Sequence, residues 1–427
     1  MENSFDTRRL VRDFDFSKVL DFAKALIRTP SLSGQEQQVA RLCIEEARRL
    51  GFSGNTDPTG NFVARLRVGS GKGPRIVLTG HLDTVNANTA EWTDGAGPFD
   101  AVVRDGRLYG RGASDMKAAV ACMLHAAALC KGLPSEHFGG EIYMVGTVVE
   151  ELFEGACFLE ALEAIKPDYV VVGEATRCRI NIGQRGRAEV VVTVHGIPCH
   201  ASCGRDTINP IEQAGVVLGL FGEEYEPERD SLLGPRDLVA TDIKIPVGGG
   251  GGVDGRGGNS TVPNRVEITY DARLLEGDTM ESIKALFRDR LDRAHAQGRM
   301  KWPDGRPPEV FIADDEHTTY SGVKLKRPKF APAWKTPADS EIVRKASVGI
   351  EKVGLPAELG SYGFCTDASA LVEFRKRHPE HDVQVIGFGP SREELAHVVD
   401  EYVEIDELRS AFDGYVGLAA ELLRSER

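Results

Sequence analysis

Short runs of apolar residues that do not alternate with polar ones recur along this chain. A run of this kind is typical of a strand that is buried on both faces of a parallel sheet. Between the runs, segments such as 117–130 are rich in alanine and apolar residues and contain no proline, which favours helix. The alternation predicts an α/β fold with a mixed, mainly parallel sheet flanked by helices. The four runs are residues 75–80, 142–149, 169–173 and 383–388.

The N-terminal part of the chain carries a helix-start signal. Ser33 and Glu36 have the spacing of a capping box, in which each side chain satisfies a backbone N–H group of the first turn. Val39, Cys43 and Ala47 then follow at helical spacing. We therefore expect a helix that begins with Ser33 and Glu36 capping each other.

The pattern changes around residue 184. Residues 266–274 alternate between apolar and polar side chains, as expected for a strand with one face in water. Residues 278–296 carry apolar positions on one stripe of a helix. Half-exposed strands mixed with helices predict a smaller α+β domain inserted into the first. We set the boundaries at residues 1–183 and 323–427 for the two parts of the first domain and 184–322 for the inserted one.

Polar residues stand where the apolar runs end, and this placement predicts a site. In an open α/β sheet, ligands bind beyond the carboxyl ends of the strands, so residues that follow different strands meet there. Two imidazoles and three carboxylates gathered in this way suit a pair of divalent metal ions. Each residue alone is more often a solvated loop residue or a helix cap; their joint occurrence favours a site. The five are His81, Asp115, Glu151, Glu174 and His397.

Two neighbours of these residues carry further expectations. Asp83 lies two positions after His81, so both side chains point the same way on an extended chain and the Asp83 carboxylate can accept a hydrogen bond from the imidazole. Glu150 and Glu151 are adjacent and therefore point in different directions. One can bind metal while the other, Glu150, is free to act as a general base.

Composition narrows the class of protein. The 427 residues exceed one ordinary core, which favours two domains, and the net charge of −13 argues against a nucleic-acid partner. No stretch approaches the length of a membrane span, and the first residues lack the features of a signal peptide. The eight scattered cysteines resemble reduced thiols. We expect a cytoplasmic protein that contacts neither nucleic acid nor membrane.

The order of these motifs resembles that of the M20 metallopeptidases, a family that includes succinyl-diaminopimelate desuccinylases, acetylornithine deacetylases, aminoacylases and carboxypeptidase G2-like enzymes. The resemblance implies a zinc-peptidase-like catalytic domain with two zinc ions, and an inserted lid domain through which the chain forms a homodimer. The motifs are residues 80–85, 109–117, 150–151, 173–176 and 389–397.

The resemblance also implies roles for single residues. Asp115 resembles the ligand that bridges the two metal ions, Asp83 the residue that orients the first histidine, and Glu150 the general base. A cis peptide bond after the bridging aspartate is common in the family, so we expect one between Asp115 and Met116. The ligand set implied by the resemblance is His81, Asp115, Glu151, Glu174 and His397.

Four residues of the inserted segment are expected at the substrate. His200 resembles a family histidine that stabilises the oxyanion from across a dimer; the alternative is a buried histidine at a strand end. Arg273 resembles an arginine that binds a substrate carboxylate, and a surface salt bridge to Asp271 or Glu267 is its structural alternative. Asn259 is a weaker match because of its spacing. Arg185 is either a hinge residue or a substrate contact.

The expected activity is hydrolysis of a C–N amide bond in a small, carboxylate-bearing substrate such as an N-acyl amino acid or a dipeptide. Zinc is the favoured metal, although manganese or cobalt would accept the same ligands. Glu150 would take a proton from the attacking water and return it to the departing nitrogen. Hydrolytic removal of an amino group from an unusual small amine is the alternative reaction. A catalytically idle metal-binding assembly module is the alternative of another class, although a free Glu150 argues against it.

Overall fold

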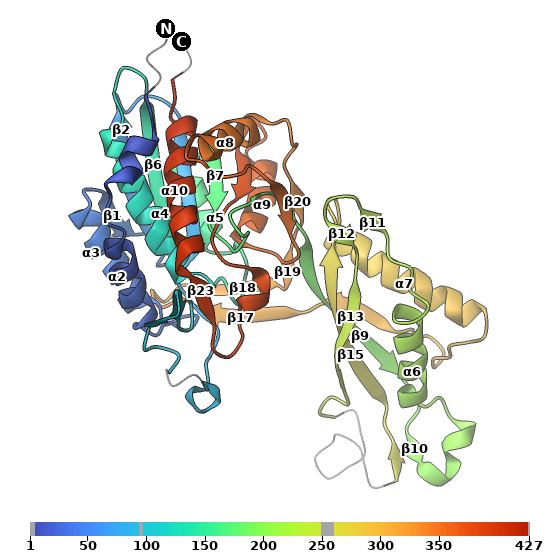
Figure 1. Ribbon diagram of the computed structural model, residues 1–427. Helices are drawn as coiled ribbons and strands as arrows, with labels where there is room; N and C mark the ends of the chain where they lie inside the picture. The colour runs from blue at the N-terminus through green and yellow to red at the C-terminus, as the bar shows by residue number, and fades with distance from the viewer. Residues whose placement is uncertain (1–4, 94–96, 249–259, 426–427) are drawn as a thin grey trace. The chain divides into compact units, whose positions relative to one another are not determined.

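The computed structural model describes residues 5–93, 97–248 and 260–425, which fold as two compact units. Unit 1 consists of Met1–Gln184, Glu316–Leu325 and Trp334–Arg427. Unit 2 consists of Arg185–Asp315 and Lys326–Ala333. The chain therefore passes from unit 1 into unit 2 and back twice, and the colours of the ribbon in Figure 1 follow this path along the sequence.

Unit 1 is built on a nine-stranded sheet whose path runs β1-β2-β6-β3-β7-β22-β8-β20, with β21 pairing to β8. At its centre β3 is parallel to β6 and β7, and β22 is parallel to β7, whereas the outer pairs β1–β2, β2–β6 and β8–β20 are antiparallel. The strands are β1 (Ser53–Thr56), β2 (Phe62–Gly69), β3 (Arg75–His81), β6 (Gly139–Thr147), β7 (Tyr169–Val172), β8 (Ile180–Gln184), β20 (Trp334–Lys335), β21 (Leu359–Tyr362) and β22 (Gln384–Gly387).

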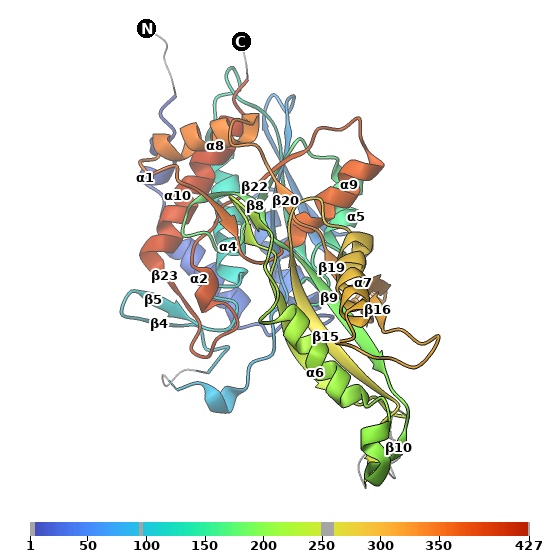
Figure 2. The same ribbon diagram turned by 90° about the vertical axis from the view of Figure 1, so that its right-hand side faces the viewer.

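Helices cover both faces of this sheet (Figure 2). Helices α2, α4, α8 and α10 lie on one face, and α5 and α9 pack against apolar side chains of β3, β7 and β22 on the other. A small antiparallel sheet, β23-β5-β4, completes the unit. The elements are α1 (Arg8–Arg12), α2 (Ser17–Ile27), α3 (Gln37–Arg49), β4 (Val102–Arg104), β5 (Arg107–Tyr109), α4 (Lys117–Leu129), α5 (Phe158–Ile165), α8 (Glu341–Lys352), α9 (Ala370–Arg377), β23 (Tyr402–Glu404) and α10 (Ile405–Leu422).

Unit 2 contains an antiparallel sheet in the order β13-β15-β9-β16, to which β19 adds beside β9. Two helices, α6 and α7, bury their apolar faces together with the inward residues of these strands. The elements are β9 (Gly186–His195), β10 (Cys199–His200), α6 (Pro210–Phe221), β11 (Arg229–Asp230), β12 (Gly234–Pro235), β13 (Leu238–Lys244), β14 (Thr261–Val262), β15 (Arg265–Leu274), α7 (Met280–Ala296), β16 (Glu309–Ile312) and β19 (Phe330–Ala331). Strands β17 (Asp314–Thr318) and β18 (Lys324–Pro328) pair with each other.

The predicted fold class is confirmed, because the central sheet is mixed with a parallel core and the antiparallel sheet is separate. Two local expectations were wrong. Strand β6 ends at Thr147 rather than at residue 149, because the chain turns there. Ser33 and Glu36 form no capping box: Glu36 is itself the N-cap of α3 and makes no side-chain cap hydrogen bond. Among the residues that the structure describes, we find no helix with the length and apolar character that a membrane span requires.

Candidate metal centre

The predicted ligands in unit 1 follow neighbouring strands of the central sheet. His81 is the last residue of β3, Glu151 lies just beyond β6, and Glu174 lies just beyond β7. These three strands are parallel, so their carboxyl ends meet at one edge of the sheet. Asp115 precedes α4, and His397 lies between β22 and β23. The sheet order therefore collects residues that are far apart in the sequence.

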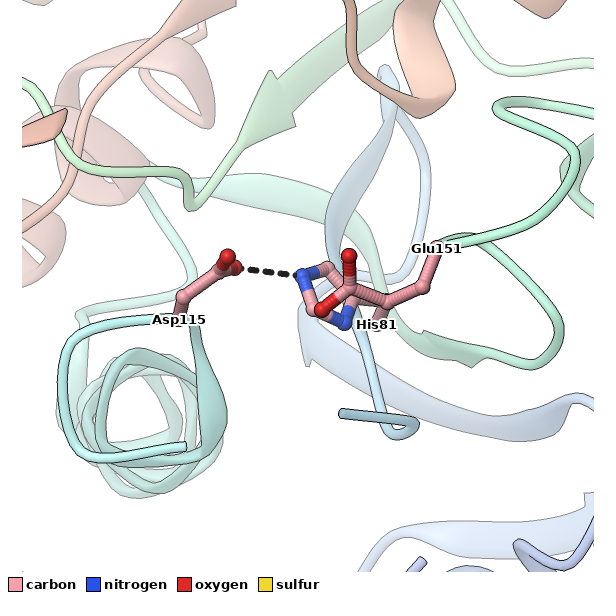
Figure 3. A group of neighbouring side chains, drawn as sticks. All are labelled: His81, Asp115 and Glu151. Carbon is pink, nitrogen blue, oxygen red and sulfur yellow. Dashed lines mark hydrogen bonds and ion pairs between the residues drawn. The ribbon is translucent and has the colours of Figure 1, made fainter. Parts of the chain in front are cut away.

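Asp115 lies between the two histidines. Its Oδ1 is 2.7 Å from Nε2 of His81, and its Oδ2 is 3.0 Å from Nε2 of His397. Figure 3 shows the Asp115 carboxylate directed at the His81 ring, with Glu151 close to the same ring. Because each carboxylate oxygen faces a different imidazole, Asp115 has the arrangement of a residue that serves two metal positions.

The remaining two carboxylates divide between the histidines. Glu174 Oε1 lies 3.4 Å from His81 Nε2, and Glu151 Oε2 lies 3.0 Å from His397 Nε2. One ligand atom each from His81, Asp115 and Glu151 can be chosen within 4.8 Å of one another, which marks them as a candidate metal site. The structure thus brings all five expected side chains together.

The donor set fits a divalent metal ion. Imidazole nitrogen and carboxylate oxygen are the ligands of catalytic zinc sites, and they also suit manganese and cobalt. Burial would lower the pKa of His81, but the Asp115 and Glu174 carboxylates beside it hold that pKa well above its usual range. Burial raises the pKa of Glu174, and it raises the pKa of Glu151 to about 6. Closely packed acidic groups of this kind are well compensated by bound cations.

The backbone around Asp115 is as expected from the resemblance: the Asp115–Met116 peptide bond is cis. A buried carboxylate that we did not predict holds this loop. Oε1 of Glu401 accepts the backbone N–H groups of Gly112, Ser114 and Asp115 at 2.8–3.1 Å. Its Oε2 forms an ion pair of 2.5 Å with Arg111. Glu401 therefore ties the Asp115 loop to the segment that follows His397.

The Asp83 carboxylate does not accept the hydrogen bond that we expected from the His81 imidazole. The Nδ1–H group of His81 donates to the backbone carbonyl of Asp83 at 2.9 Å, whereas the nearer Asp83 carboxylate oxygen is 3.8 Å away. The carboxylate instead accepts the backbone N–H groups of Glu150 and Glu151, both at 3.1 Å. The imidazole still keeps Nε2 toward the ligands, but a carbonyl rather than a carboxylate fixes its tautomer.

Glu150, the expected base, is buried beside the ligands. Burial raises its pKa well above the usual range of a carboxyl, although the nearby His81 counteracts this. A raised pKa of this origin is a feature of catalytic carboxyl groups. The side chain therefore has the environment that a proton-transfer group requires.

The expected substrate residues belong to unit 2 or lie outside the described residues. His200 is exposed rather than buried, and its Nδ1 is 2.9 Å from the Ser202 hydroxyl. Arg273 forms the salt bridge that we named as its alternative, 2.8 Å from Asp271. Arg185 donates to Asp237 at 2.8 Å. Both arginines line one pocket of about 440 Å³. Asn259 lies outside the described residues.

Several buried polar residues near the centre were missed by the sequence reading. They share one property: their side chains accept hydrogen bonds from loops that carry the candidate site, which a pattern of single residues does not reveal. The sequence does single out Glu36, which stands just before α3, but its spacing from Ser33 predicted a capping role. The missed residues are Glu36, Asn61, Asp367 and Glu401.

The chain is similar in sequence to proteins of a known family. The profile of Peptidase family M20/M25/M40 matches residues 77–421, which include all five candidate ligands. The uncharacterized protein YgeY of Escherichia coli K12 is 28% identical over 389 residues, covering 89% of this chain and 88% of YgeY. A succinyl-diaminopimelate desuccinylase of Bordetella avium is 27% identical over 400 residues, covering 91% of this chain and 94% of that protein.

A solved structure supports the same fold. The YXEP protein of Bacillus subtilis, described as a dinuclear metal binding peptidase from the M20 family, aligns with a TM-score of 0.66 at 14% identity. The alignment covers 95% of this chain and 98% of that protein. The similarity therefore extends over both units and is a similarity of fold.

Proposed function

The chain belongs to peptidase family M20/M25/M40, and from this premise we propose that it is a dinuclear metal hydrolase that cleaves an amide bond of a small, carboxylate-bearing substrate. The single observation that carries the proposal is the position of Asp115, with one carboxylate oxygen toward each of two histidines. YXEP, which has the same fold, is described as binding two metal ions. A shared carboxylate is what a two-metal centre needs.

Five side chains would hold the metal ions. His81 lies beside Glu174, His397 lies beside Glu151, and Asp115 contacts both histidines. When bound, two divalent cations, with zinc as our proposed choice, would supply Lewis acidity and lower the pKa of a water molecule. Manganese or cobalt would fit the same donors.

Glu150 would move the proton. Its buried carboxylate takes a proton from the attacking water and donates it to the departing nitrogen, which must leave as an amine. Asp83 holds the N–H groups of both Glu150 and Glu151, so the base and its neighbouring ligand keep a fixed relation to each other. As the family resemblance implies, His200 would stabilise the oxyanion from across the proposed dimer.

The substrate class is proposed from two sources. The Bordetella avium relative is named for removing a succinyl group from an amino acid, which is an amide hydrolysis on a molecule rich in carboxylates. In unit 2, Arg185 and Arg273 line one pocket, where a substrate carboxylate would take the place of their present partners Asp237 and Asp271. We therefore propose an N-acyl amino acid or a dipeptide as substrate.

The test is Glu150→Ala in the zinc-loaded protein, assayed on a panel of N-acyl amino acids and dipeptides. We expect turnover to fall by about 10²–10⁴-fold, the usual contribution of a general base, while metal content by mass spectrometry is unchanged. Unchanged turnover would remove Glu150 from the mechanism. Release of ammonia from an amine, without cleavage of any amide, would favour the deamination alternative. Full metal occupancy with neither reaction would favour an idle assembly module.

We also propose that the chain forms a homodimer through unit 2. Strand β13 is at the edge of its sheet, and its residues beyond Leu238 are exposed. Val239 and Ile243 on this strand expose 55% and 52% of their surface, and Ile211 of α6 exposes 50%. An exposed apolar strand at a sheet edge is a surface on which a second copy can pair.

A further inference from the structure

The turn that follows β6 carries both Glu150 and Glu151, and its backbone is held from outside. Four consecutive backbone N–H groups, in residues 148–151, each donate to a buried side chain from an earlier part of the chain. The pairs are Val148 with Asn61 Oδ1 (3.1 Å), Val149 with Glu36 Oε1 (2.9 Å), Glu150 with Asp83 Oδ1 (3.1 Å) and Glu151 with Asp83 Oδ2 (3.1 Å).

The turn needs such support because of Val149. Its φ angle is 60°, in the left-handed region that a β-branched residue rarely adopts. Strained residues of this kind persist only where the surrounding structure fixes them, and they are concentrated at functional sites. Val149 is also the residue immediately before Glu150, so a change in its backbone angles would redirect both glutamates.

Glu36 holds Val149 directly. Its side chain is fully buried, and the single oxygen Oε1 accepts N–H groups from both Gly34 and Val149, at 2.8 and 2.9 Å. Among the described residues, its other oxygen, Oε2, has no hydrogen-bond partner. One acceptor atom thus joins the loop before α3 to the turn after β6.

We propose that Glu36 is a positioning residue for this turn: by holding the Val149 N–H group it fixes the directions of Glu150 and Glu151. This inference depends on the proposed function, since it concerns the geometry of the proposed base and its adjacent metal ligand. Glu36 does not touch the reacting atoms. Its effect is transmitted through one backbone hydrogen bond, and the acceptor oxygen rather than the negative charge is what the role requires.

Glu36→Gln and Glu36→Met separate these two properties. Glutamine keeps the acceptor oxygen and removes the charge, whereas methionine has a similar length and removes the acceptor. We expect Glu36→Met to lower kcat by about 10–100-fold, the usual effect of losing a partner that orients a metal site, with a change in KM of less than about threefold. Glu36→Gln should stay within about threefold of the wild type in both.

Metal affinity gives a readout that is independent of turnover. Competition for Zn²⁺ against a chromophoric chelator should show about tenfold weaker binding in Glu36→Met and wild-type binding in Glu36→Gln. Glu46→Met is the matched control, because Glu46 lies in α3, the helix that begins just after Glu36, and pairs with Arg49 and His125 rather than with the turn. Its kcat and zinc affinity should equal those of the wild type.

The outcomes distinguish this inference from the proposed function. Loss of turnover in Glu150→Ala together with full turnover and zinc affinity in Glu36→Met would overturn the role of Glu36 alone. Equal losses in Glu36→Gln and Glu36→Met would also overturn it, because the acceptor would then not be the relevant atom. Should Glu36→Met fail to fold, Glu36→Asp, which is one methylene too short to reach Val149, is expected to lower kcat while Glu36→Gln does not.

Discussion

The strand-end loops of unit 1 and the edge of the sheet in unit 2 depart from ordinary burial in opposite directions. In the loops, charged side chains such as Glu150 and Asp83 are buried. At the edge, apolar side chains such as Val239 and Ile243 are exposed. Buried charge and exposed apolar surface both cost stability unless something compensates for them. The first region therefore has the buried acidic groups that bound cations would compensate, and the second has the exposed apolar surface that our proposed homodimer would cover.

Removal of metal should have the largest effect and should act on the loops alone. After dialysis against a chelator we expect turnover to fall below about 1% of its initial value, because the hydrolysis that we propose needs the cations, and to return on addition of Zn²⁺. Hydrogen exchange measured by mass spectrometry should increase in residues 112–117 and 148–151 and stay constant in β13.

The outcome that contradicts this prediction is equal exchange in all of these segments with full activity after chelation. The compensation in unit 1 would then come from the protein itself rather than from bound cations.

The buried ion pair between Glu401 and Arg111 allows a comparison within unit 1. Glu401→Ala should lower the free energy of unfolding by about 3–5 kcal/mol, because it leaves the Arg111 charge buried and unpaired. Glu404→Ala breaks the more exposed pair with Arg107 and should cost less than about 1 kcal/mol. Urea unfolding at constant metal concentration measures both. Similar losses would show that burial of charge does not set the loops apart.

Charged substitutions in the exposed edge strand β13 test the proposed dimer surface of unit 2. Val239→Glu combined with Ile243→Glu should weaken the proposed dimer by about 100-fold, equivalent to about 2.7 kcal/mol, as measured by sedimentation equilibrium. Val103→Glu is the control, since Val103 is an exposed valine on β4 of unit 1. A protein that remains monomeric at all concentrations, or a dimer that Val103→Glu also disrupts, would contradict the assignment of this edge.

His125 tests the cost of a buried polar group away from the metal site. It lies on α4 against Phe14 and Phe22, and burial lowers its pKa from 6.5 to about 4 despite the nearby Glu46; Arg49 of α3 and Lys18 of α2 act in the same direction as burial. Between pH 6.5 and about 4 the unfolded chain binds a proton that the folded chain does not. The contribution of His125 is therefore intact above pH 6.5 and is lost as the pH falls through this window.

The expected size is about 2 kcal/mol less stability at pH 5 than at pH 7 from this one group. Urea unfolding at both pH values should show this difference in the wild type and a smaller one in His125→Gln, whose side chain does not titrate. The same pH dependence in both proteins would show that folding does not lower the pKa of His125.

The strands of the two units also show how much of the fold could be predicted from the sequence. Residues 75–80 and 169–173 were predicted as strands, and β3 and β7 occupy Arg75–His81 and Tyr169–Val172. The alternation in residues 266–274 gave β15. The spacing of apolar and polar residues in these segments is set by the local sequence, so it predicts the strands without knowledge of tertiary contacts. The end of β6 was misplaced because Val148 and Val149 continue the apolar run while their N–H groups bind Asn61 and Glu36.

The amino-acid sequence by itself predicted a mainly parallel sheet with polar residues at its strand ends, because strands buried on both faces leave unalternating apolar runs, and such strands are typical of parallel sheets. Only the tertiary structure decided which atoms each polar side chain hydrogen-bonds. The His81 imidazole bonds the backbone carbonyl of Asp83 rather than its carboxylate. The Glu36 side chain accepts the N–H group of Val149 instead of capping α3. The Asp83 carboxylate instead bonds Glu150, and Glu36 bonds Val149; both contacts join segments far apart in the chain, so their geometry exists only once the sheet has brought those segments together.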